Sequence, residues 1–229
     1  MSCTPDEIAG ISSGVTWAAD NATVYYTTVD EAWRPDTVWR HRLGSGQPDE
    51  QVFHEPDERF WVGMGRTRSN KYVIIAAGSA ITSQVWFGDA ADPNAEFISV
   101  LPRRDGVEYS VDHAVIGGED RFLILHNDGA VNFTLVEAPV SDPTDQRTLI
   151  EARDDVRLDG VDAFADQLVI SYRREALPRI QLWPIGADGY GTPRGDRLRL
   201  RAGLVRLGGQ PELVDAQTAG RHHLLRDAA

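Results

Sequence analysis

The chain has 229 residues, a length that suits one domain or one and a half. Its 23 basic and 35 acidic side chains give a net charge of −12, which argues against nucleic-acid binding because phosphates require a basic face. The single cysteine, Cys3, excludes an internal disulfide and a cysteine-rich zinc site. No apolar stretch approaches the roughly 18 residues of a membrane span, and residues 1–15 lack a signal-peptide pattern. We therefore expect a cytoplasmic protein that does not associate with membranes.

Apolar runs rich in β-branched and aromatic residues recur along the chain, at residues 23–28, 71–78, 121–126 and 167–172. Their starts lie 48, 50 and 46 residues apart. Each run follows a segment that ends in a turn and precedes a shorter strand-like run, at residues 38–42, 84–87, 132–136 and 179–183. A further short run follows in the first three units, at residues 51–54, 97–101 and 147–150. Polar turn clusters rich in Gly, Pro and Asp separate the runs.

This repeat predicts an all-β fold, a partial β-propeller of about four four-stranded blades. One such sheet has two apolar faces, and radial stacking against neighbouring sheets covers both. A β-sandwich is the alternative, although a sandwich lacks this unit repeat. We expect blades at residues 1–55, with a ragged N-terminus, and at residues 56–105 and 106–152. An incomplete blade at residues 153–195 and a divergent Arg-rich tail at residues 196–229 complete the division.

Two glycine motifs resemble functional loops. Gly10-Ile11-Ser12-Ser13-Gly14 matches the nucleophile elbow G-x-S-x-G, but that elbow needs a strand before it and a helix after it. Here a short polar segment precedes the motif and a strand-like run follows, so we interpret the match as chance. Gly63-Met64-Gly65-Arg66 hints at a phosphate loop, but no crossover helix follows. It fits better as the end of an inner strand where backbones pack closely.

The histidines offer little catalytic chemistry. Asp112-His113 and His126 resemble a base with its orienting partner, but no serine or cysteine nucleophile is evident near them, so packed core histidines are expected. His222-His223 in the tail lacks further ligands at helpful spacing for a metal. We therefore predict no catalytic residue, no metal site and no cofactor. The pattern identifies no substrate-binding residue.

Acidic residues gather in the predicted turns. Residues 1–190 hold 16 basic and 31 acidic side chains, whereas residues 191–229 hold seven arginines and four acids. The acidic turns are either solvated loops or an acidic funnel that steers basic ligands. The clusters are Asp49-Glu50, Glu55, Asp57-Glu58 and Asp154-Asp155.

Several segments resemble, in order and without large gaps over residues 6–195, the propeller of oligopeptidase B-type serine peptidases of the prolyl oligopeptidase family. The segments are DTVWRHRLG (36–44), DERFWVG (57–63), GRTRS (65–69), LPRR (101–104), EYSVDH (108–113), NDGA (127–130), LDGVD (158–162) and FAD (164–166). The resemblance implies a seven-bladed propeller paired with an α/β-hydrolase domain. That hydrolase domain carries a Ser-Asp-His triad and cleaves peptides after Arg or Lys. The propeller caps its active site and excludes large folded substrates.

No part of the chain matches the family's triad, so no catalytic residue is carried over. We expect the chain alone to be inactive and to act with a separately encoded hydrolase-domain chain on basic peptides. A stand-alone interaction module and the inactive remnant of a split gene are the alternatives. Open propeller faces predict self-association. The Arg-rich tail is interpreted as the product of a frameshift.

Overall fold

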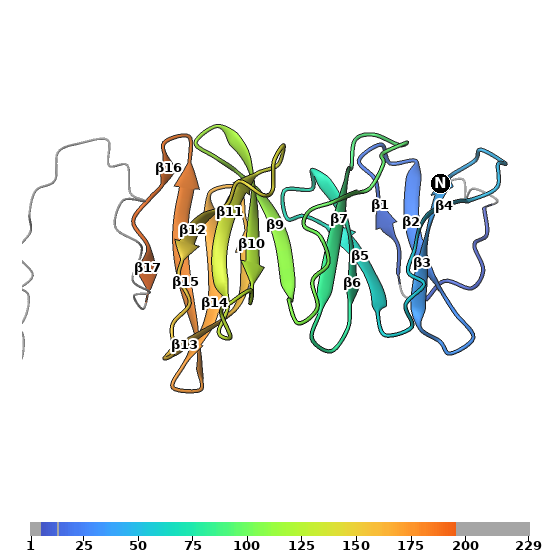
Figure 1. Ribbon diagram of the computed structural model, residues 1–229. Helices are drawn as coiled ribbons and strands as arrows, with labels where there is room; N and C mark the ends of the chain where they lie inside the picture. The colour runs from blue at the N-terminus through green and yellow to red at the C-terminus, as the bar shows by residue number, and fades with distance from the viewer. Residues whose placement is uncertain (1–5, 13, 196–229) are drawn as a thin grey trace, which may run out of the picture.

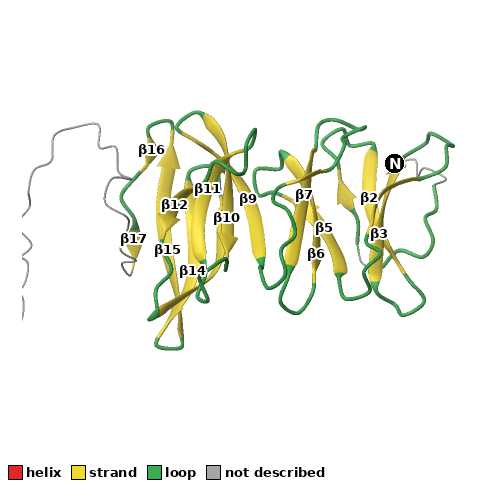
Figure 2. Ribbon diagram, viewed as in Figure 1, coloured by secondary structure: helices red, strands yellow, loops and turns green. Residues whose placement is uncertain are grey.

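The computed structural model describes residues 6–12 and 14–195, and these fold entirely into strands and turns (Figures 1 and 2). They form four antiparallel sheets that stand side by side in chain order (Figure 1). The first two sheets contain β1 (Thr16–Trp17), β2 (Thr23–Val29), β3 (Pro35–Arg42), β4 (Glu50–His54), β5 (Trp61–Arg66), β6 (Tyr72–Gly78), β7 (Ser83–Asp89) and β8 (Ile98–Ser99). The last two contain β9 (Tyr109–Ile116), β10 (Glu119–His126), β11 (Thr134–Pro139), β12 (Arg147–Ile150), β13 (Val156–Ala163), β14 (Gln167–Arg174), β15 (Leu177–Gly186), β16 (Gly189–Tyr190) and β17 (Arg194–Gly195).

Each sheet is a meander in which strands adjacent in sequence pair with one another. This arrangement confirms the predicted all-β propeller architecture with four-stranded units. The fourth sheet differs at its outer edge, where β16 and β17 both pair with β15, at different points along it. Pro193 lies between these two short strands, and a proline cannot donate to a ladder. The outer position of this sheet is therefore divided between two short pieces.

The second strand of each sheet explains how the sheets stack. In β10, Phe122 and Ile124 pack in the core shared with the second sheet, whereas Leu123 and Leu125 pack in the core shared with the fourth. Successive strand residues point to opposite faces, so a nearly continuous apolar run buries both. β6 repeats the pattern, with Val73 and Ile75 in the core shared with the first sheet. Apolar cores therefore fill the three spaces between neighbouring sheets.

Backbone hydrogen bonds join the sheets at their turns. Ala19 N donates to Ala90 O at 2.7 Å between the first and second sheets, and Gly117 N donates to Gly186 O at 2.9 Å between the third and fourth. Because every sheet is an antiparallel meander, turns after the first and third strands lie at one end of the molecule. Turns after the second and fourth strands lie at the other end. These two sets of turns form the two ends of the propeller.

Candidate functional site

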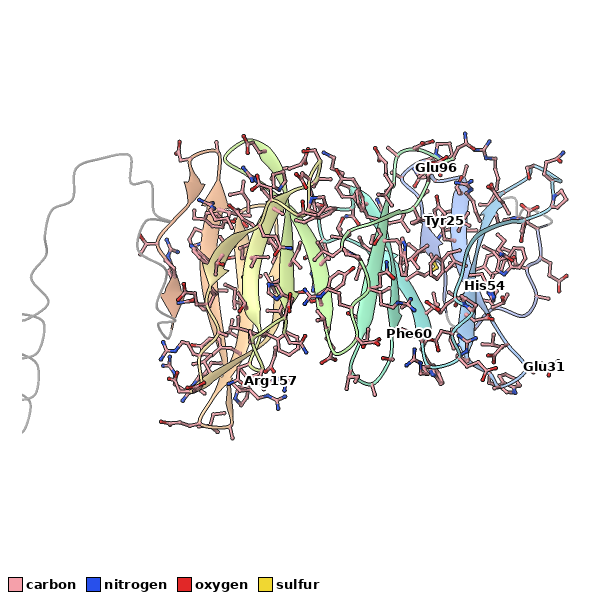
Figure 3. All side chains as sticks on the ribbon, in the orientation of Figure 1. Tyr25, Glu31, His54, Phe60, Glu96 and Arg157 are labelled. Atoms are coloured by element: carbon pink, nitrogen blue, oxygen red, sulfur yellow. The ribbon has the colours of Figure 1, made fainter. Side chains whose placement is uncertain are left out.

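Carboxylates outside ion pairs gather at both ends of the propeller. At the end formed by turns after first and third strands, eight carboxylates take part in none of the ion pairs found among residues 6–12 and 14–195. We call this set the acidic end; it comprises Asp20, Asp89, Asp92, Glu96, Asp142, Asp145, Asp166 and Asp188. Figure 3 places Glu96 at this end and Glu31 and Arg157 at the opposite end. At the opposite end, arginines pair with many of the acids, for example Arg59 with Asp57 at 2.7 Å, although Glu31, Glu58 and Asp154 lie outside the ion pairs found among the described residues.

Most of the acidic clusters expected from the sequence are occupied by structural contacts. Asp49 accepts hydrogen bonds from the Tyr26 hydroxyl and His41 Nδ1, each at 2.6 Å. Glu55 is buried and pairs with Arg103, whose guanidinium lies over the Phe60 ring. These carboxylates hold the fold together and are not free to attract ligands.

The remaining predicted clusters divide in the same way. The side chain of Arg59 holds the pKa of Asp57 at about 2. Asp155 pairs with Arg153 at 2.7 Å. The acidic funnel expected from residues 49–58 and 154–155 is therefore only partly compensated, because Glu58 and Asp154 take part in none of the ion pairs found among the described residues.

Asp112 joins three sheets through one buried carboxylate. Its Oδ1 accepts hydrogen bonds from the backbone N–H groups of Arg68 at 3.0 Å and His113 at 2.8 Å. Its Oδ2 accepts one from the N–H of Ala163 at 2.8 Å. Arg68 follows β5 in the second sheet and Ala163 ends β13 in the fourth. Asp112 is therefore a structural anchor of the inner strands and not a base positioned beside a nucleophile.

His113 is completely buried in the same region, as expected for a core histidine. Its Nδ1 lies 2.8 Å from Ser69 Oγ and its Nε2 lies 3.0 Å from Asp120 Oδ1. Lys71 Nζ donates to the other oxygen of Asp120 at 2.6 Å, and lowers the pKa of that carboxyl. Burial lowers the pKa of His113 despite the neighbouring carboxylate. The ring is therefore neutral at pH 7 and has both nitrogens engaged.

Inner strands β5, β9 and β13 surround a hollow with a volume of about 800 Å³. Its lining combines backbone, apolar and charged groups: Gly63, Met64, Gly65, Arg66, Thr67, Arg68, Asn70, Ile74, Ala76, Ser110, Val111, Asp112, Val161 and Asp162. At its rim, Arg68 forms an ion pair with Asp162 at 2.5 Å and lies over the Phe164 ring. The hollow therefore lies where the second, third and fourth sheets meet.

The other motifs have no catalytic arrangement. Ser12 lies before β1 and its N–H donates to Thr27 O at 2.8 Å, and no helix follows it within residues 14–195. The His126 Nδ1 accepts a hydrogen bond from the Asp128 N–H at 3.2 Å, and burial lowers its pKa. His222-His223 and the tail lie outside the described residues. Within residues 6–12 and 14–195, no group of metal-ligating side chains is arranged to hold an ion, and no helix is long and apolar enough to cross a membrane.

Comparison with known proteins agrees with this architecture. The profile of the prolyl oligopeptidase N-terminal β-propeller domain matches residues 2–205. The chain belongs to the prolyl oligopeptidase family. This assignment identifies the four meanders as blades of the family's propeller, and it agrees with the resemblance drawn from the sequence.

Curated relatives and solved structures support the family propeller. The chain is 35% identical over 176 residues to Protease 2 of Moraxella lacunata, covering 76% of this chain and 25% of that protein. It is 34% identical over 190 residues to Dipeptidyl aminopeptidase BI of Pseudoxanthomonas mexicana, covering 81% and 25%. Oligopeptidase B from Trypanosoma brucei, solved with covalently bound antipain, superposes with a TM-score of 0.73 at 34% identity, covering 80% and 26%. Oligopeptidase B from Leishmania major gives 0.72 at 29% identity, covering 80% and 26%. The chain thus spans about a quarter of the length of these relatives.

Within the prolyl oligopeptidase propeller, the inner strand end predicted at Gly63-Met64-Gly65-Arg66 is confirmed, but the close backbone packing expected there is wrong, because a Cβ added at either glycine would meet none of the described residues within 4 Å. The signal for the hollow was present in the alternation of the two glycines, which lie on one face of β5. Only the register showed that Gly63 lies opposite Ala76 and Gly65 opposite Ile74. The ion pair between Arg68 and Asp162 was also not predicted, because the two residues are 94 positions apart in sequence.

Proposed function

We propose that this propeller caps the active site of an oligopeptidase B-type serine endopeptidase that cleaves peptides after Arg or Lys in the cytoplasm. The observation that carries the proposal is the 34% identity and shared fold with the Trypanosoma brucei oligopeptidase B. The nucleophile, base and oxyanion hole would come from a hydrolase domain, because no catalytic constellation occurs among residues 6–12 and 14–195. The propeller would contribute access control and electrostatics.

Access control follows from the stacking of the blades. Apolar cores fill all three spaces between the four sheets, so the wall is closed to peptides except along its inner strands and ends. A chain that must pass beside the inner strands has to be short or unfolded. This supports exclusion of large folded substrates as the role of the domain.

The acidic end supports a second role, steering of basic peptides. Eight carboxylates outside the ion pairs of the described residues create a negative potential that attracts Arg- and Lys-containing substrates. In the complex with a hydrolase domain, we expect kcat/KM for an Arg peptide to fall several-fold as ionic strength rises from about 10 to about 200 mM. The dependence of kcat/KM on ionic strength should be weaker in a triple variant that carries Asp89→Asn, Asp92→Asn and Glu96→Gln. An unchanged salt profile in this variant would remove the steering role.

Association with a hydrolase domain tests the capping role. The tagged chain would be co-expressed with the hydrolase part of the Moraxella lacunata Protease 2, and the stoichiometry of the purified species measured by light scattering. We expect a one-to-one complex. A stable monomer that ignores the hydrolase domain would instead favour a stand-alone interaction module. A chain that accumulates only as unfolded aggregate would favour an inactive remnant.

Exopeptidase action is the second candidate, because one relative of similar identity is named Dipeptidyl aminopeptidase BI. The two activities separate on a pair of fluorogenic substrates. An endopeptidase cleaves a substrate whose N-terminus is blocked, whereas a dipeptidyl aminopeptidase requires a free N-terminal amine. We expect cleavage of the blocked Arg substrate by the complex.

A further inference from the structure

Two glycines open the hollow beside β5. Gly63 pairs with Ala76 and Gly65 with Ile74, so both glycines and both apolar side chains point to the same face of the second sheet. A Cβ added at either glycine would meet nothing within 4 Å. Neither glycine has the left-handed backbone that requires this residue type. Glycine weakens a strand. A strand glycine beside open space is typical of a place where a ligand or another backbone approaches closely.

The edge of β5 offers backbone hydrogen bonds to that space. β5 is the first strand of its sheet and, among the strands of the described residues, pairs only with β6. Thr67 N donates to Tyr72 O at 3.0 Å. In an antiparallel pair, every second residue of a strand forms hydrogen bonds with the partner strand. Gly65 and Gly63 therefore also form backbone hydrogen bonds with β6. The N–H and C=O groups of Met64 and Val62 therefore point away from β6. An extended peptide can add to such an edge.

Arg66 supplies the charge at the end of this edge. It lines the hollow, and no ion pair of Arg66 is found among the described residues. Its Nη2 donates to Asn70 O at 2.6 Å, while its buried Nε has no hydrogen-bond partner within residues 6–12 and 14–195. The other charged groups of the lining are compensated, since Arg68 pairs with Asp162 and both Asp112 oxygens accept backbone N–H groups. One uncompensated guanidinium fits a single carboxylate.

We propose that the C-terminal end of an extended oligopeptide binds in this hollow. Its backbone pairs with the edge of β5, its last side chain lies over Ile74 and Ala76, and its terminal carboxylate binds Arg66. The inference rests on the proposed peptidase function. It adds a subsite on the propeller that binds the C-terminal end of the substrate. A multiply charged anion fits less well, because Asp112 and Asp162 also line the space.

Peptide binding to the isolated chain tests this subsite without any hydrolase activity. The probe is fluorescein-labelled Gly-Ala-Val-Ala-Leu, made with a free C-terminal carboxylate and as the C-terminal amide, with binding followed by fluorescence polarisation. We expect the amide to bind at least about tenfold more weakly, since a charged hydrogen bond is lost. Arg66→Gln should bind acid and amide equally. Arg59→Gln is the matched control, because Arg59 is an exposed arginine paired with Asp57 at the opposite end.

A second variant approaches the same site from its apolar side. Gly65→Val fills the hollow above Ile74 and should abolish binding of the acid probe while leaving the thermal unfolding temperature equal or higher. Equal binding of acid and amide to the unmodified chain would overturn the proposal, as would full binding by Gly65→Val. Because the hydrolase domain is absent, failure here leaves the association experiment above unaffected.

Discussion

At the scale of single residues, Asp112 concentrates the connection between three blades in one side chain. Asp112→Ala removes the acceptor of three backbone N–H groups, from residues 68, 113 and 163. We expect the free energy of unfolding to fall by about 2–4 kcal/mol, because buried donors lose their partner. Urea denaturation measures the change. Asp145→Ala, in an exposed turn, is the control and should stay within about 0.5 kcal/mol of the parent; an equal effect at both positions would contradict the anchor role.

His113 makes stability depend on pH near neutrality. Burial lowers the pKa of His113 in the folded state below the unfolded value of about 6.5, so the unfolded chain binds protons more readily. Stability is therefore complete above that unfolded value and is lost as pH falls below it. We expect the free energy of unfolding to decline from pH 7.5 to pH 5.5, a range above the titration of Asp120, whose pKa is lowered by Lys71.

The variant His113→Gln isolates this contribution. It should flatten the decline between pH 7.5 and pH 5.5, and His126→Gln should remove a separate part, because burial also lowers the pKa of His126. Urea denaturation at each pH measures both slopes. A slope unchanged by His113→Gln would show that this histidine does not titrate on unfolding.

The residue scale also marks the limit of what the sequence could predict. The prediction that His113 is a core histidine is confirmed. A histidine within a strand-like run, with no nucleophile evident near it, is typical of a packed core residue. The hollow at Gly63 and Gly65 was not predictable, since its floor depends on the β5–β6 register. The pairing of Glu55 with Arg103 was not predictable either, because 48 residues separate the two side chains in sequence.

At the scale of elements, strands with two buried faces hold the propeller together. Leu123 on β10 is completely buried in the core between the third and fourth sheets. Leu123→Ala should lower the free energy of unfolding by about 2–5 kcal/mol, because it leaves a cavity. Val115→Ala on the adjacent β9 is the control, since Val115 is 52% exposed, and should change stability by about 0.5 kcal/mol or less. A loss below 1 kcal/mol for Leu123→Ala would contradict a tightly packed core.

The second strand of each blade was predictable from its apolar run, whereas the ends of the shorter strands were not. The run expected at 132–136 begins as a strand only at Thr134, because Phe133 adopts a positive φ of 66° after a turn. The run expected at 97–101 is paired only at Ile98–Ser99. Turn conformation and edge position decide these boundaries, and neither is encoded by hydrophobic periodicity.

At the scale of the whole molecule, the fourth sheet presents an apolar outer face. Ile180 and Leu182 on β15 lie on the same face and are 59% and 37% exposed. We expect the chain to self-associate through this face, and Ile180→Lys with Leu182→Lys to shift it to monomer. Sedimentation velocity measures the distribution. A parent chain that is already a monodisperse monomer would contradict this expectation.

The central claim is that the chain serves as the cap of a serine peptidase whose chemistry lies in a hydrolase domain. Hydrolysis of a fluorogenic, N-blocked Arg peptide tests it most directly, with the chain alone, a hydrolase domain alone and the two together. We predict that the chain alone hydrolyses nothing. We predict that the pair hydrolyses the Arg peptide but does not hydrolyse a large folded protein. Hydrolysis by the chain alone, or a pair no different from the hydrolase domain in rate and substrate size, would contradict it.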